Sequence, residues 1–212
     1  MLQTQSVYPA TLELLKKVMA LPSLSDTSLV GGTALALYYG HRISVNLDLF
    51  SEATFSVPTV KEELEQLADR SNMDWEWSMV EETSLSGIID GIKVDIIRYR
   101  YPLIDALTVS EGVRLVSIKD IAAMKLSACA QRGIKKDFFD IYELLQHHTL
   151  EYILACFVEK YPKTSISHII RSLVYFDDAD LELDPISLRE CSWSDVKAGM
   201  ETNVSQYLSD QI

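Results

Sequence analysis

The chain has 212 residues, of which 48% are hydrophobic and 24% are charged, and its formal net charge is −12. These values are typical of a globular protein with a hydrophobic core, and they exclude a disordered or collagen-like chain. So negative a charge argues against nonspecific coating of nucleic acid. The charge is uneven, however, because residues 93–136 carry 9 Lys and Arg against 4 Asp and Glu. This basic segment indicates either a bound phosphate group or an ordinary lysine-bearing helix surface.

The sequence also bears on location. It has no run of about 20 apolar residues that could span a bilayer, and its start lacks the basic and apolar regions of a secretory signal. The three cysteines are widely spaced and include no CxxC pair, which is typical of free thiols in a reducing compartment. We therefore expect a cytoplasmic protein with no membrane partner.

The first fifty residues combine helical and extended patterns. Apolar spacing predicts a helix over residues 9–20, and the run 28–32 predicts a short buried strand that ends in two glycines. A short apolar helix follows and should end at Gly40. Residues 43–51 alternate between apolar and polar, which predicts a strand with Val45 on its buried face.

The next segment completes a predicted sheet. Pro58 opens a helical stretch, and residues 73–80 alternate as a strand does. Asp90-Gly91 lies between two apolar runs, which is the strongest short-range signal of a β-hairpin. The first half of the chain is therefore predicted to be a mixed sheet with helices.

The second half has helical patterns throughout. Ser117 and Asp120 have the spacing of a capping box, at the start of a helix that should end at Gly133. Further helical stretches follow, and the acidic run 177–184 is expected to be an exposed loop. The predicted fold class is α+β. We expect a mixed-sheet core over residues 1–105 and a helical bundle over residues 106–212.

Gly31, Gly32 and Thr33 stand between the predicted strand and helix near residue 30. Glycines let the backbone approach a ligand closely, and a helix N-terminus offers unpaired N–H groups to an anion such as a triphosphate. A Gly-Gly pair at such a turn is also common without any ligand. The pattern by itself leaves both interpretations open.

Three oxygen-bearing side chains lie on predicted strands. Asn46 and Asp48 are two residues apart and should share the polar face of one strand, as ligands of Mg²⁺ would. Asp95 lies within an apolar strand, where a carboxylate is costly unless it is paired or binds a metal. The alternatives are an ordinary polar strand face and a pair between Asp95 and Lys93.

Charged residues also recur on two predicted helices. Lys125 and Arg132 are seven residues apart and should lie on one stripe, and Lys125 is surrounded by apolar residues. Asp137 and Asp140 face the same way on the next helix. The alternative is pairing within that helix between Lys136 and Asp140.

Together these blocks resemble one family. The sequence is similar to the AbiEii/AbiGii nucleotidyltransferase toxins in five blocks: Gly31 to Leu37, Gly40 to Phe50, Val94 to Ile97, Ser117 to Leu126 and the charged residues up to Tyr142. The similarity covers about residues 28–145 well and much of the remainder weakly. It implies a polymerase-β-like nucleotidyltransferase fold and the toxin of a toxin–antitoxin or abortive-infection system. The expected partners are an NTP, an RNA acceptor such as a tRNA 3′ end or else a protein acceptor, and an antitoxin protein.

The resemblance also implies residue roles. The nucleotide-binding residues would be Gly31, Gly32, Thr33, Arg42, Lys125 and Arg132. The ligands of Mg²⁺ or Mn²⁺ would be Asn46, Asp48 and Asp95. The catalytic residues would be Asp48, Asp95, Lys125, Asp137 and Asp140. The expected reaction is an in-line displacement at the α-phosphorus of the nucleotide.

The chain departs from the family pattern at one position. The pattern has Asp-x-Asp where this sequence has Asn46-Leu47-Asp48. An amide oxygen can bind Mg²⁺ but carries no charge, so we expect weaker metal binding and slower transfer. The alternative function is a catalytically impaired nucleotidyltransferase fold that binds a nucleotide or a protein.

Overall fold

The structure of the protein is a computed structural model, and it describes residues 1–211. The helices are α1 (Pro9–Met19), α2 (Gly31–Tyr39), α3 (Val57–Arg70), α4 (Ile118–Arg132), α5 (Lys135–His147), α6 (Leu150–Lys160), α7 (Ile166–Ser172), α8 (Asp177–Asp180) and α9 (Trp193–Ser209). The strands are β1 (Ser28–Leu29), β2 (Leu47–Ser51), β3 (Trp75–Val80), β4 (Ser84–Ile89), β5 (Ile92–Arg98), β6 (Thr108–Ser110) and β7 (Val113–Leu115). Two short 3-10 turns, η1 (Thr4–Ser6) and η2 (Pro22–Leu24), flank α1.

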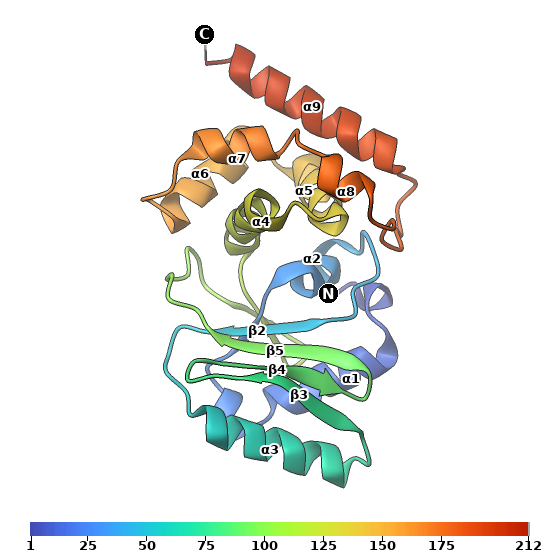
Figure 1. The fold of residues 1–212 in the computed structure, drawn as a ribbon, viewed down its shortest axis with the longest axis vertical. Coiled ribbons are helices and arrows are strands. Elements are labelled where there is room, and N and C mark those ends of the chain that lie inside the picture. Colours follow the sequence, from blue (N-terminus) through green and yellow to red (C-terminus); the bar gives the residue numbers. More distant parts are fainter. Residues whose placement is uncertain (212) are drawn as a thin grey trace.

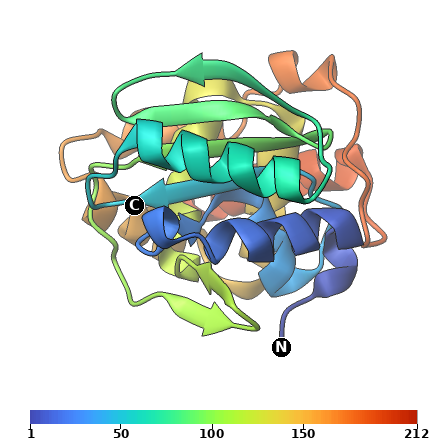
Figure 2. The same cartoon turned by 90° about the horizontal axis from the view of Figure 1, so that it is seen from below.

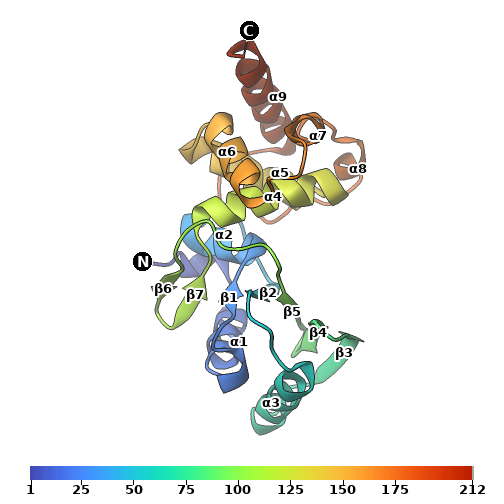
Figure 3. The same cartoon turned by 90° about the vertical axis from the view of Figure 1, so that its left-hand side faces the viewer.

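The strands form a mixed sheet in the order β3-β4-β5-β2-β1-β7-β6. β2 pairs in parallel with β5, and β1 pairs in parallel with β7, whereas the other neighbours are antiparallel. Helices α1 and α3 lie side by side on one face of this sheet (Figure 2). Helix α2 and the layer formed by α4 to α9 lie on the opposite face (Figures 1 and 3). The predicted α+β class, with its C-terminal helices, is confirmed.

Local sequence signals account for several element boundaries. Asp90 and Gly91 both have positive φ, 50° and 76°, as the tight turn of the β4–β5 hairpin requires. The Ser117 hydroxyl accepts the N–H of Asp120 at the start of α4. Gly133, with φ of 53°, follows the last residue of that helix. These predictions are confirmed.

Two predicted segments were wrong in part. β2 begins at Leu47 rather than at residue 43, because the preceding chain pairs elsewhere: the Ile43 N–H donates to the Ile186 carbonyl, and Ser44 bridges to Val7. Val45 is therefore 45% exposed and not part of a buried strand face. The acidic run 177–184 is not a simple loop, because it begins with α8 and buries one alanine of that helix.

One hydrophobic core joins the sheet and the helical layer. The sheet continues through β6 and β7, so the chain leaves it between Leu115 and Ile118. The division into units at residue 105 stays a prediction. Within residues 1–211, no helix combines the length and the apolar character that crossing a bilayer requires. The three cysteines are free thiols.

Candidate active site

The turn between β1 and α2 brings the backbone against a carboxylate. The Val30 N–H donates to the Asp48 carbonyl at 2.9 Å, and Gly31 begins α2 with φ of 69°. A Cβ at Gly31 would lie 2.8 Å from Asp48 Oδ2, so this position requires glycine on two grounds. No side chain of residues 1–211 caps α2, and its first N–H groups therefore stay available to an anion.

Two carboxylates lie next to each other on the sheet. Asp48 of β2 and Asp95 of β5 are register partners on neighbouring parallel strands. Burial and the negative charge of Asp95 raise the pKa of Asp48. Lys93 Nζ binds Asp95 Oδ2 at 2.7 Å, whereas Asp95 Oδ1 is buried without a hydrogen-bond partner in the described chain. A carboxylate pair with one unsatisfied oxygen fits a divalent cation, which takes oxygen ligands.

These groups face a cavity of about 510 Å³ between the sheet and α4. Five of the predicted site residues line it: Gly31, Asp48, Asp95, Lys125 and Arg132. The structure therefore brings together residues that are up to 101 positions apart in the sequence. The cavity is wide enough for a small-molecule ligand. Its walls carry the free end of α2, the carboxylate pair and the partly exposed Arg132 side chain.

Lys125 belongs to a buried ion network. Its Nζ lies 2.9 Å from Asp137 Oδ1 and 2.5 Å from Asp140 Oδ2. Burial alone would lower the pKa of Lys125, but the two carboxylates raise it. Arg132 Nε binds Asp137 Oδ2 at 2.8 Å, and half of the Arg132 side chain stays exposed at the cavity. Lys125 is thus held by α5, while Arg132 has N–H groups left for a ligand.

Asp140 holds Arg42 behind the cavity wall. Arg42 Nε and Nη2 donate to the two oxygens of Asp140 at 2.6 and 2.9 Å, and His41 Nε2 lies 2.7 Å from Oδ1. Burial would raise the pKa of Asp140, but the charges of Arg42 and Lys125 hold it well below its ordinary value. A Cβ at Gly32 would overlap Arg42 Nη2, so this glycine makes room for the guanidinium.

The structure leaves several predicted site residues away from the cavity. Gly32, Thr33, Arg42, Asn46, Asp137 and Asp140 do not line it. The buried Thr33 hydroxyl instead contacts Ser44 at 2.8 Å and donates to the Asn46 carbonyl. The alternative of a Lys136–Asp140 pair is wrong, since no such pair occurs among residues 1–211. The roles predicted for these residues in binding and catalysis stay predictions.

Other residues that line the cavity are not among the predicted site residues. Phe50, Tyr99 and Tyr161 give the cavity an aromatic side. Phe50 follows Asp48 by two residues, so strand alternation alone could have placed it on the same face. The basic segment is only partly at the site, because Arg114 donates to the carbonyls of Met19, Leu24 and Thr27.

Comparisons with known proteins agree with this fold. JHP933 of Helicobacter pylori superposes with a TM-score of 0.61 at 19% identity, covering 97% of this chain and 96% of that one. MenT4, a nucleotidyltransferase toxin of Mycobacterium tuberculosis H37Rv, gives 0.57 at 11% identity, covering 93% and 82%. The antibiotic-resistance factor ANT(2'')-Ia gives 0.52 at 14% identity, covering 71% and 90%. The fold is that of the nucleotidyltransferases.

Sequence comparison gives the family. A model described as "Nucleotidyl transferase AbiEii toxin, Type IV TA system" matches residues 14–110 and 92–206. The chain belongs to this family, as its resemblance to the AbiEii toxins predicted. It is also 36% identical over 205 residues to the uncharacterized protein aq_aa25 of Aquifex aeolicus (strain VF5), covering 93% of this chain and 96% of that protein.

Proposed function

We propose that this member of the AbiEii family transfers a nucleoside monophosphate from an NTP to an RNA acceptor, with a protein as the other acceptor class. The observation that carries the proposal is the pair Asp48 and Asp95, which meets the uncapped start of α2 and Arg132 at one cavity. This arrangement combines hard oxygen ligands with donors for phosphate oxygens.

In the proposed reaction, an acceptor hydroxyl oxygen attacks the α-phosphorus of the NTP. The new bond forms between that oxygen and phosphorus, the bond to the β-phosphate oxygen breaks, and pyrophosphate leaves. The hydroxyl proton passes to water, because Asp95 Oδ1, which lacks a partner in the described chain, is the oxygen that a cation would take. The N–H groups at the start of α2 and the free N–H groups of Arg132 bind phosphate oxygens. Lys125 supplies positive charge at the cavity wall while α5 holds it in place.

A divalent cation, Mg²⁺ or Mn²⁺, fits the same carboxylates. Asp48 and Asp95 would hold it, and it would supply charge stabilisation to the phosphates. The raised pKa of Asp48, caused first by burial and then by the charge of Asp95, supports this assignment, because a cation would offset the cost of keeping both carboxylates ionised. The described residues contain no cluster of three His, Cys, Asp or Glu side chains around such an ion. Asn46 would have to contribute an amide oxygen from just before β2.

The family relationship further supports a toxin role, with an antitoxin protein as partner. The proposed place of action is the cytoplasm, where NTPs and RNA occur together. The alternative is a catalytically impaired member that binds a nucleotide or a protein. One specific observation favours it: position 46 carries an amide, and this residue does not line the cavity.

The test is transfer of label from α-labelled ATP, GTP, CTP and UTP to total RNA and to protein, with Mg²⁺ or Mn²⁺. Wild type, Asn46→Asp and Asp48→Ala are compared. We expect label in the wild type, more in Asn46→Asp, and none in Asp48→Ala. Label in Asn46→Asp alone would favour the binding alternative. If neither the wild type nor Asn46→Asp transfers label, and both proteins are folded, the transferase proposal is refuted.

Metal-assisted nucleotide binding is a separate readout. A ligand that binds only the native state raises the melting temperature. We expect Mg²⁺ plus an NTP to raise the melting temperature of the wild type but not that of Asp48→Ala. The same shift in both proteins would place the nucleotide elsewhere.

A further inference from the structure

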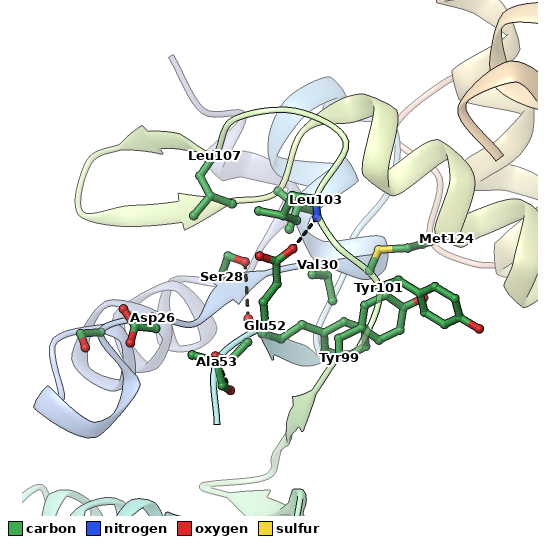
Figure 4. Close-up of a pocket in the computed structure, with 14 residues that line it drawn as sticks. Asp26, Ser28, Val30, Glu52, Ala53, Tyr99, Tyr101, Leu103, Leu107 and Met124 are labelled. Carbon is green, nitrogen blue, oxygen red and sulfur yellow. Dashed lines mark hydrogen bonds between the residues drawn. The ribbon is translucent and has the colours of Figure 1, made fainter. Parts of the chain in front are cut away.

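A second cavity, of about 500 Å³, adjoins the candidate active-site cavity, and Figure 4 shows the residues that line it. The two cavities share Val30, Phe50, Tyr99 and Met124 as a common wall. Beyond this wall, the side chain of Glu52 points into the second cavity, toward Leu103 (Figure 4). We call the second cavity the Glu52 pocket.

The two cavities follow one row of side chains along β2. Residues two apart on a strand point to the same face, so Asp48, Phe50 and Glu52 lie in line, with Glu52 directly after the last residue of the strand. The distance from Asp48 to Glu52 along the strand is about 13 Å, at roughly 3.3 Å per residue. A nucleotide whose phosphates lie at Asp48 could therefore extend its base toward Glu52.

The pocket offers aromatic faces. Phe50 stacks on Tyr99 with ring centroids 4.7 Å apart and planes 24° apart. Tyr99 in turn lies 5.5 Å from Tyr101, which is 47% exposed. Stacking on such rings is a general way to bind a flat heterocycle, and it tolerates any base because every base has a π-face.

The polar groups of the pocket accept hydrogen bonds. Glu52 accepts the N–H of Leu103, and an ionised carboxylate keeps further lone pairs for other donors. Asp26 and the hydroxyls of Ser28 and Ser51 also line the pocket. Among residues 1–211, no Lys, Arg or His lines the pocket. The chemistry suits an uncharged group with N–H donors and disfavours a phosphate.

We propose that the Glu52 pocket binds the nucleobase of a nucleotide at the active site, and that Glu52 selects bases with an exocyclic amino group. The inference rests on the proposed function for the position of the phosphates. The same chemistry can come from two sources, the incoming NTP or the terminal nucleotide of an RNA acceptor. Guanine and cytosine present an amino group that inosine and uridine lack, and a carboxylate accepts from it.

Nucleosides test the pocket apart from the transfer reaction, because they carry no phosphate for the Asp48–Asp95 site. Binding of guanosine against inosine, and of cytidine against uridine, is measured by saturation-transfer NMR to wild type, Glu52→Gln and Glu76→Gln. Glu76 is exposed on the edge strand β3 and serves as the matched control. We expect the wild type and the control to prefer the amino-bearing nucleosides by about tenfold or more, because only these donate a hydrogen bond to the charged carboxylate. Glu52→Gln should weaken this preference several-fold, because its amide oxygen still accepts a hydrogen bond but carries no charge.

A second arm identifies the source of the base. The same variants are titrated with GTP against ITP, and with short RNAs that end in C or in U. A weakened preference among NTPs in Glu52→Gln assigns the pocket to the incoming nucleotide, and a weakened preference among RNAs assigns it to the acceptor. Equal affinities within each pair in the wild type, or an undiminished preference in Glu52→Gln, would overturn the proposal. A Glu52-dependent nucleoside preference without any transfer activity would support the pocket and count against the proposed function alone.

Discussion

The buried carboxylate Asp140 should be among the most sensitive positions for stability. Its two oxygens accept from Arg42 at 2.6 and 2.9 Å, contact Lys125 at 2.5 Å and meet His41 at 2.7 Å. Asp140→Asn keeps the shape but removes the charge, so Arg42 loses its ion-pair partner inside the protein. Breaking such a buried pair costs about 3–5 kcal/mol of unfolding free energy. For a chain of this size, we expect a melting temperature lower by about 6–20 °C.

The assay is denaturant unfolding and thermal melting of wild type, Asp140→Asn and Glu13→Gln at pH 7. Glu13 forms an exposed pair with Lys17 at 2.8 Å within α1, and its own side chain is 66% exposed. Removing this charge should leave the unfolding free energy nearly unchanged, because solvent screens an exposed ion pair. A loss in Asp140→Asn no larger than in Glu13→Gln would refute the argument that the network stabilises the helical layer.

The difference in unfolding free energy between wild type and Asp140→Asn should depend on pH. Because the native state lowers the pKa of Asp140, its stabilisation is complete above the ordinary value of 3.8 and is lost as the pH falls below it. The gap between wild type and Asp140→Asn should therefore stay constant from pH 7 to pH 5 and shrink in stronger acid. If this difference disappeared near neutral pH, it would contradict a lowered pKa of Asp140 in the native state.

Three further substitutions test the site. Asp48→Asn should abolish transfer yet raise the unfolding free energy by about 0.5–2 kcal/mol, because burial and the charge of Asp95 raise the pKa of Asp48 and make its ionised form costly. Denaturant titrations should show this gain at pH 7 and not below pH 3.8, where the carboxylate is protonated in both states. Gly32→Ala should cost about 1–3 kcal/mol through overlap with Arg42, and a double-mutant cycle with Arg42→Lys should show a smaller cost. Asn46→Asp should raise the initial rate of label transfer at limiting Mg²⁺; an unchanged rate would mean that position 46 does not bind the ion.

Local features of the sequence were sufficient for much of the fold. The Asp90-Gly91 turn and the Ser117 cap act within a few residues, so their conformations depend little on the rest of the chain. Alternation along β2 and β5 likewise indicated that Asp48 and Asp95 belong to polar strand positions. The same reasoning failed for Val45, because the chain before β2 pairs with a segment about 140 residues later, which strand periodicity cannot indicate.

The sequence by itself therefore determined the α+β class, the family and five of the residues that line the candidate active-site cavity. Only the tertiary structure decided which charges face that cavity. Arg42 and Asp140 are 98 residues apart, and their hydrogen bonds turn the guanidinium away from the cavity. Lys125 is likewise held by α5, whereas Arg132 keeps an exposed part. The reason is physical: a buried charge is stable only beside an opposite charge, and folding alone determines which charges become neighbours.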